Sequence, residues 1–273
     1  MPTTRTTTGS LPHWETVPHD VPAAIREIKL ALRAQIAGSG RSVAELVAEI
    51  EDFLAGEIAD IKATKARGDQ VWPVIDFTDI HRGTVSAEQL ALLHRRGCAV
   101  VRGHFDQAQA RRWDVDAVAY VDNNNFFDHY AGPADDFFGD LEMSKPEIYP
   151  IYWSSSQMEA RQHPRMAEVQ SFLNAQWTHQ SDGRSWFDPD RDSLYPDRIR
   201  RRPPGVDSGG LGTHLDPGTL DLWMTTGYQQ TFRHLFNGDF ARYDPWDAAY
   251  RTEAAQYPGS TMCSAFRTFQ GWT

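Results

Sequence analysis

His214 and Asp216 are the residues of this chain whose types and spacing could hold a catalytic metal ion. Side chains at positions i and i+2 of a strand point the same way, so this imidazole and this carboxylate can reach one ion. Together they form the first half of the 2-His-1-carboxylate triad, which holds non-haem Fe(II) and leaves other coordination positions open. The spacing predicts an Fe(II) site at His214 and Asp216; the alternative is a loop histidine hydrogen-bonded to a nearby aspartate.

The His-x-Asp motif occurs twice, and chance alone predicts about one copy in a chain with 10 His and 25 Asp. The first copy, His104-Phe105-Asp106, lies between a predicted strand and a predicted helix, where Asp106 is better used as an N-cap. The second follows the small-residue loop 207–213 and precedes Pro217-Gly218, as expected at the mouth of a β-barrel. Context therefore favours the second copy as the metal pair.

Several runs of the sequence resemble one family. The run RIRRRPPGVDSGGLGTHLDPGTLDLW, which contains the second motif, resembles the YbiU-like proteins, a domain-of-unknown-function family. These proteins are similar to the phytanoyl-CoA-hydroxylase type of Fe(II)/2-oxoglutarate oxygenases. Other runs share the likeness: VIDFTDI followed by LHRRGCAVVRG, EIYPIYWSSSQMEARQHPRM, SFLNAQW, FNGDFARYDPWDAAYR and SAFRTFQGWT. The resemblance extends from about Val71 to the end of the chain.

This resemblance implies an α+β protein built on a double-stranded β-helix (a cupin-like jelly roll) with helices packed outside. It implies that His214 and Asp216 are iron ligands, with 2-oxoglutarate as cosubstrate and a small molecule as the hydroxylated substrate. The strand from Phe266 to Trp272 would border the cosubstrate pocket, which makes Trp272 a candidate contact for 2-oxoglutarate. The alternative for Trp272 is an aromatic side chain that fills the barrel.

One part of the oxygenase pattern is missing from the sequence. Such enzymes need a distal histidine and a basic residue that pairs with the 5-carboxylate of 2-oxoglutarate, both on late strands. After Asp216 the chain has one histidine, His234, on a predicted helix, where packing or a surface position is the better interpretation. We therefore expect a chain that lacks the C-terminal half of the jelly roll, with weakened iron binding and without the anchoring charge for 2-oxoglutarate.

Two other functions stay open. A cupin-type enzyme would use a jelly-roll metal site for non-oxidative chemistry, and would bind metal without 2-oxoglutarate turnover. A non-catalytic jelly-roll binding module would fold stably without specific metal affinity.

Three further clusters allow more than one interpretation. One face of a predicted strand carries Arg198, Arg200 and Arg202. Their charge either prevents aggregation at a solvated strand edge or binds an anionic substrate. Acidic residues among aromatics could suggest a glycosidase pair, although such clusters arise freely in a chain with 37 acidic residues: Asp135, Asp136, Asp140 and Glu142. Six aromatic residues could line a pocket or form core: Phe126, Phe127, Tyr130, Tyr149, Tyr152 and Trp153.

The pattern of apolar residues predicts three regions. Residues 1–20 are a disordered lead-in, and 21–70 are a helical extension broken at Gly38-Ser39-Gly40 and restarted by a capping box at Ser42. Residues 71–273 form the truncated oxygenase-like domain. Further helices are predicted from Ser86 to a stop at Gly97, from Asp106, from Ser156 to about Trp177 and from 219 to about 237, and a buried strand is predicted at 98–101. The apolar face of the extension packs on a core or forms a dimer contact, so a homo-oligomer is possible.

Composition excludes several classes. With 27 Lys+Arg against 37 Asp+Glu the net charge is −10, which is repulsive to nucleic acid. No apolar run approaches the roughly 20 residues of a membrane span. Two cysteines, Cys98 and Cys263, give no disulfide framework, and the N-terminus lacks the apolar segment of a signal peptide. The sequence predicts a cytoplasmic protein that acts on a small molecule.

Overall fold

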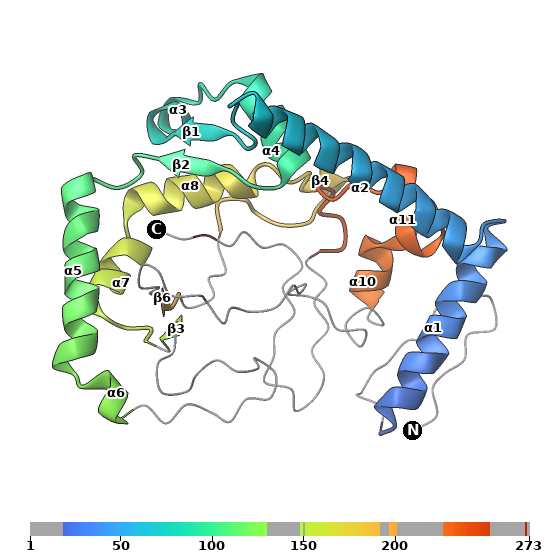
Figure 1. Ribbon diagram of the computed structural model, residues 1–273, viewed down its shortest axis with the longest axis horizontal. Coiled ribbons are helices and arrows are strands. Elements are labelled where there is room, and N and C mark those ends of the chain that lie inside the picture. Colours follow the sequence, from blue (N-terminus) through green and yellow to red (C-terminus); the bar gives the residue numbers. More distant parts are fainter. Residues whose placement is uncertain are drawn as a thin grey trace. The chain divides into compact units, whose positions relative to one another are not determined.

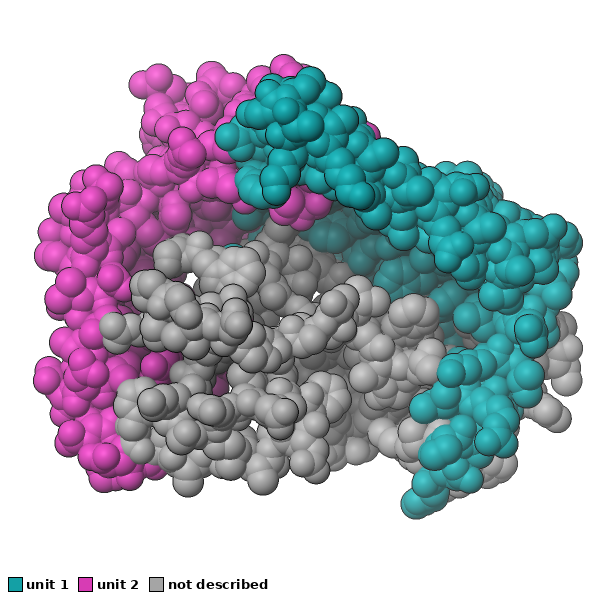
Figure 2. Space-filling model, in the orientation of Figure 1, with its two compact units in different colours: residues 1–73, 173–189, 215–273 teal, residues 74–172, 190–214 magenta. Residues whose placement is uncertain are grey.

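A computed structural model describes residues 19–129, 148–149, 151–191, 197–200, 226–251 and 271. The chain divides into two compact units, shown in different colours in Figure 2. Unit 1 comprises residues 1–73, 173–189 and 215–273, and unit 2 comprises residues 74–172 and 190–214.

Unit 1 begins with two long helices, α1 (Val21–Gly38) and α2 (Val43–Ala66) (Figure 1). Asp20 caps α1, because its carboxylate accepts a hydrogen bond from the Ala23 backbone at 2.9 Å. Ser42 and Glu45 form the capping box that the sequence predicts for α2. Both helices of the predicted extension are thus confirmed, together with the break between them.

The core of unit 1 joins α1 to α11 (Arg233–Phe236), which follows α10 (Thr226–Thr231) and precedes the short 3-10 helix η1 (Phe240–Arg242). Ile28 and Phe236 are buried at its centre, and apolar side chains of the same helices surround them: Ala24, Ala31, Leu32, Phe232 and Leu235. This packing fixes α11 against the N-terminal helix.

A small hairpin completes the described part of unit 1. Strands β4 (Gln180–Ser181) and β5 (Arg184–Ser185) pair antiparallel. Asp182 and Gly183 form the turn with positive φ angles of 52° and 72°, as an Asp-Gly hairpin turn requires. Trp186, directly after β5, is buried at 7 % exposure.

Unit 2 contains the short parallel pair β1 (Val74–Asp76) and β2 (Val100–Arg102). Helices α3 (Phe77–Arg82) and α4 (Ala87–Arg96) connect them. Ser86 and Gln89 form the predicted capping box of α4, and Gly97 ends the helix with a φ of 67°. Ile75 of β1 and Leu93 of α4 are fully buried, so the crossover helix packs its apolar side into the core of this unit.

The rest of unit 2 is mainly helical: α5 (Gln107–Asn123), α6 (Phe126–His129), α7 (Ser155–Arg161) and α8 (Pro164–Asn174). Strands β3 (Ile148–Tyr149) and β6 (Ile199–Arg200) pair antiparallel beside them. Trp113 of α5 is buried, and its indole nitrogen donates to the Glu159 carboxylate of α7 at 2.8 Å.

Three local predictions for unit 2 are wrong. The helix predicted to start at Ser156 is capped by Ser154, whose hydroxyl accepts from the Gln157 backbone. It also ends at Arg161, because Pro164 has no N–H to donate and disfavours helical geometry at the residue before it. The predicted buried strand at 98–101 begins at Val100, which is 38 % exposed.

The described residues leave the larger predictions open. Where the structure describes the chain, strands are two or three residues long and pair as three two-stranded sheets. The jelly roll therefore stays a prediction, as does the division at residues 20 and 70. In α2, Leu46 is buried whereas Val47, Leu54 and Ile58 are 45–50 % exposed; the homo-oligomer also stays a prediction.

Candidate functional site

The predicted metal and cosubstrate residues lie outside the described part of the chain. This holds for His214, Asp216 and Trp272, and also for Asp135, Asp136, Asp140 and Glu142. Within the described ranges, no group of three His, Cys, Asp or Glu side chains is arranged to hold a metal ion. His234 is half-buried on α11, as the sequence predicts for a helix-packing histidine.

The first His-x-Asp motif is used structurally. A carboxylate oxygen of Asp106 accepts a hydrogen bond from the Gln109 backbone at 3.0 Å, which makes it the N-cap of α5. The His104 ring hydrogen-bonds the Val101 backbone. The predicted capping role of Asp106 is thus confirmed.

Burial lowers the pKa of His104, and the positive charge of nearby His163 lowers it further. The hydrogen bond to Val101 opposes these effects but does not outweigh them. The neutral form of His104 is therefore favoured, consistent with a packing role beside Phe105, whose ring centroid is 4.2 Å away.

Unit 2 has an aromatic pocket of about 370 Å³, within the size range of small-molecule sites. Its lining comes from the end of α5, from α6 and from the segment after β3: Tyr120, Asn124, Phe126, His129, Ile151, Tyr152 and Trp153. We call this the aromatic pocket.

The aromatic pocket separates the six aromatic residues that the sequence left undecided. Phe126, Tyr152 and Trp153 line it, whereas Tyr149 is 7 % exposed and packs edge-on against Phe126 at 5.2 Å between ring centroids. The side chain of Phe127 and all of Tyr130 lie outside the described residues. Three of the six residues therefore form a pocket wall and one forms core.

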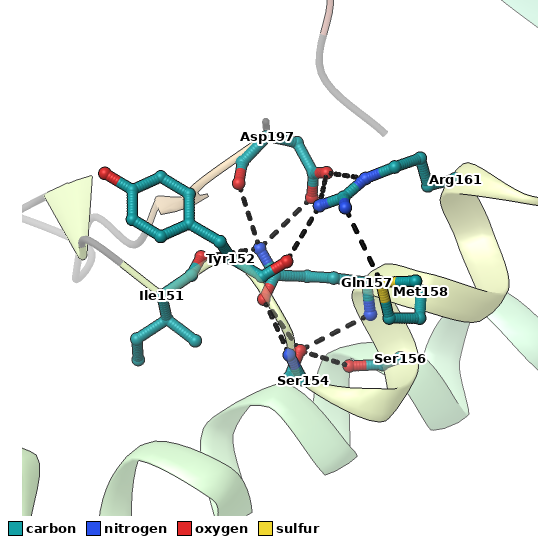
Figure 3. A network of polar contacts seen from close by, with 8 residues as sticks. All are labelled: Ile151, Tyr152, Ser154, Ser156, Gln157, Met158, Arg161 and Asp197. Atoms are coloured by element: carbon teal, nitrogen blue, oxygen red, sulfur yellow. Dashed lines mark hydrogen bonds and ion pairs between the residues drawn. The ribbon is translucent and has the colours of Figure 1, made fainter. Parts of the chain in front are cut away.

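A network of hydrogen bonds holds the wall formed by residues 151–153 (Figure 3). The Gln157 side-chain amide donates to the Ile151 carbonyl at 2.7 Å, and an Arg161 Nη donates to the Tyr152 carbonyl at 2.9 Å. Ser154 closes the network, because its backbone N–H and hydroxyl both donate to the Gln157 Oε1. The backbone beside the pocket is thus fixed by side chains of α7.

The same network reaches the strand that leads toward the predicted metal loop. Asp197, two residues before β6, accepts from Gln157 at 3.1 Å and forms an ion pair with Arg161 (Figure 3). The Arg198 guanidinium lies 5.9 Å from the Tyr152 ring centroid. β6 continues in sequence into residues 201–225, which contain His214 and Asp216. Gln157 and Arg161 therefore hold both the pocket wall and the start of β6.

The sequence contained a signal for this network that the prediction missed. Ser154 and Gln157 have the S-x-x-Q spacing of a capping box, but the overlapping Ser156 and Glu159 were favoured. The contacts of Asp197 join residues 36 and 40 positions apart, which no local pattern shows.

The pocket has the features of a site for a small molecule with a flat apolar face. Trp153 is 70 % exposed and Tyr120 is 40 % exposed, so both rings are available to stack on a ligand. Asn124 and His129 supply polar groups at the edge. Arg161 lies 5.5 Å from the Trp153 ring centroid and steadies that side chain.

None of the described helices is both long enough and apolar enough to cross a membrane. Cys98 is an exposed free thiol.

Comparison with known proteins identifies relatives over nearly the whole chain. The uncharacterized protein YbiU of Escherichia coli (strain K12) is 53 % identical over 261 residues, which are 95 % of this chain and 61 % of YbiU. A crystal structure named "Putative Oxidoreductase from Salmonella typhimurium LT2" is 49 % identical, with a TM-score of 0.84 over 96 % of this chain and 62 % of that one. The chain thus spans about three-fifths of the length of these relatives.

A more distant structure shares the fold. GlcNAc Inducible Gene 2 of Candida albicans is 23 % identical and has a TM-score of 0.57 over 77 % of this chain and 43 % of that one. The Gig2-like family profile matches residues 19–273. The resemblance to YbiU-like proteins is therefore confirmed, and the chain belongs to the Gig2-like family.

Proposed function

We propose that this protein is a non-haem Fe(II)/2-oxoglutarate-dependent oxygenase that hydroxylates a small molecule. The observation that carries the proposal is the Salmonella relative, whose structure is named "Putative Oxidoreductase" and which is 49 % identical over 96 % of this chain. The second His-x-Asp motif supports the proposal at the level of residues. The jelly roll and a cytoplasmic location belong to the same proposal.

The donor set suits the metal. His214 supplies an imidazole and Asp216 a carboxylate, which are ligands of non-haem Fe(II) in facial triads. Iron and 2-oxoglutarate, when bound, would supply the oxidation chemistry. The first His-x-Asp motif does not compete for iron, because Asp106 is engaged as an N-cap.

We assign substrate binding to the aromatic pocket. Its exposed rings favour a flat apolar substrate, and its few polar groups would orient that substrate. Because Gln157 and Arg161 hold residues 151–153, the pocket wall is preorganised and ligand binding need not order it.

Iron binding by matched histidine variants tests the proposal. We expect the chain, extended to the full length of its relatives, to retain Fe(II) in anaerobic equilibrium dialysis. Its His214→Ala variant should lose the metal, and its His104→Ala variant should retain it. His104 is the matched control, because it begins the other His-x-Asp motif. Equal iron retention by all three proteins would contradict the proposed site. Iron binding that depends on His214 but is unaffected by 2-oxoglutarate would favour the cupin-type alternative.

A further inference from the structure

Unit 1 contains a second pocket, of about 470 Å³, which the proposed oxygenase chemistry does not use. It lies where the turn between α1 and α2 meets α11 and η1. Its lining includes three arginines, one histidine and one carboxylate: Arg41, Arg233, Arg242, His234 and Asp239. We call it the basic pocket.

The lining of the basic pocket holds more guanidinium groups than carboxylates, although the whole chain carries −10. Asp239 is the carboxylate of the lining, and Glu49 and Asp247, outside it, pair with Arg41 and Arg233 at 2.6 and 3.5 Å. Guanidinium donors arranged as forks match the oxygens of carboxylate and phosphate groups. A ligand that uses these donors would be an anion, and it would compete with the three carboxylates for the guanidinium groups.

Two of the guanidinium groups are held in place. An Arg41 Nη donates to the Gly238 carbonyl at 2.8 Å and pairs with Glu49 at 2.6 Å. An Arg233 Nη donates to the Gln230 carbonyl at 2.9 Å. Each contact uses part of a five-donor group, so both arginines retain further N–H groups for a ligand.

Arg242 is held more loosely. Its Nε lies 3.8 Å from the Asp239 carboxylate, and the side chain is 72 % exposed. An exposed pair at this distance contributes little to stability. Arg242 can therefore turn to a bound anion without breaking a strong contact.

His234 reports the charge of this site. Burial lowers its pKa, and Arg233 and Arg242 lower it further, while Asp239 and Asp247 act in the opposite direction. A negative charge bound among these groups would stabilise the imidazolium form. Binding would thus raise the pKa of His234.

The backbone fixes the shape of the basic pocket. Gly238 has a φ of 72°, and a Cβ built there would lie 3.0 Å from the Ser39 hydroxyl and 3.4 Å from Ile36. The α11–η1 turn thus approaches the α1–α2 turn as closely as glycine permits. This approach brings Arg41 together with the arginines of α11 and η1.

We propose that the basic pocket binds a small oxyanion, either a phosphate or a carboxylate, through Arg41, Arg233 and Arg242. Three guanidinium groups, two of them held by backbone carbonyls, line one pocket whose volume suits a small molecule. The inference is independent of the oxygenase proposal, because it uses no residue of the metal motif or the aromatic pocket.

NMR titration of the His234 ring signals in the full chain tests the proposal, with a His234→Gln variant to assign them. Inorganic phosphate and succinate are added separately, and chloride at matched ionic strength serves as the control. We expect saturable shifts with phosphate, succinate or both, and none with chloride. A response to one anion alone identifies the source as phosphate or carboxylate. Shifts no larger than those with chloride would overturn the proposal.

Variants test the role of the arginines. Arg242→Gln should weaken binding about tenfold or more, as the loss of one charge-assisted hydrogen bond predicts. Arg67→Gln is the matched control, since Arg67 is also exposed, lies in unit 1 and pairs with a nearby aspartate, Asp69, at 2.9 Å. Asp239→Asn should strengthen binding. Equal affinity in the Arg242 and Arg67 variants would overturn the assignment.

Discussion

Gln157 donates from one side-chain nitrogen to both the backbone carbonyl and the carboxylate of Asp197, at 3.2 and 3.1 Å. The two residues are 40 positions apart. The same nitrogen also contacts the Ile151 carbonyl. One buried amide therefore links the helix cap of α7, the wall of the aromatic pocket and the start of β6.

Replacing Gln157 with alanine should lower the free energy of unfolding by about 2–3 kcal/mol, because buried hydrogen-bond partners are left unsatisfied. Gln89→Ala is the matched control: it removes the same position of a capping box and one contact to a backbone carbonyl, but no partner like Asp197. We expect a smaller loss of about 1 kcal/mol there. Urea unfolding measures both, and equal losses would contradict a separate contribution from Asp197.

Replacing Gly238 with alanine should destabilise the chain more than Gly183→Ala. Both glycines have a φ of 72°, so both substitutions carry the same cost of about 1–2 kcal/mol for a left-handed backbone. A Cβ at Gly238 would also meet Ser39, whereas nothing lies within 4 Å at Gly183. The difference between the two variants in unfolding free energy therefore measures the cost of the contact between the new Cβ at position 238 and Ser39. A difference near zero would show that the two turns of unit 1 do not pack this closely.

Alanine substitution should cost more stability at a core aromatic residue than at an aromatic residue of the pocket. Trp113 is 8 % exposed and hydrogen-bonded to Glu159, so Trp113→Ala should cost about 3–5 kcal/mol of stability. Trp153 is 70 % exposed, and Trp153→Ala should cost at most about 1 kcal/mol, chiefly its contact with Arg161. Thermal unfolding of both variants checks this. A large loss at Trp153 would place it in a core instead of a pocket.

The lowered pKa of His104 predicts a stability change with pH. Because burial lowers this pKa in the folded state, the unfolded chain takes up a proton first as the pH falls. The stability that the chain gains from keeping His104 neutral is fully present above pH 6.5, the ordinary pKa of histidine. It is lost as the pH falls through 6.5 toward the lower pKa of the folded state. Urea unfolding at pH 7.5 and 5.5 should show a smaller decrease for His104→Gln than for the parent chain. An equal decrease would contradict the prediction.

Local patterns predicted much of the described secondary structure. The capping boxes at Ser42 and Ser86, the N-cap at Asp106 and the stop at Gly97 lie where the sequence places them, because each depends on neighbours within four residues. Ser154 was missed, since two capping boxes overlap in the Ser-Ser-Ser-Gln run and periodicity does not choose between them.

The candidate sites were harder to predict. The sequence names the aromatic residues near the pocket, but whether Tyr149 or Trp153 is buried depends on contacts with α6 and α7. The basic pocket has no sequence signal at all. Arg41 reaches Gly238 across 197 positions, and only the packing of α1 against α11 brings them together.

Anaerobic titration of Fe(II) with 2-oxoglutarate, followed through the visible metal-to-ligand charge-transfer band, tests the oxygenase proposal most directly. We predict a band for the chain extended to the full length of its relatives and for the same protein with His104→Ala, and its loss with His214→Ala. A band requires both the metal and the cosubstrate at one site, so it reports the complete proposal. No band in any of the three proteins, or a band that survives His214→Ala, would contradict the proposed iron site.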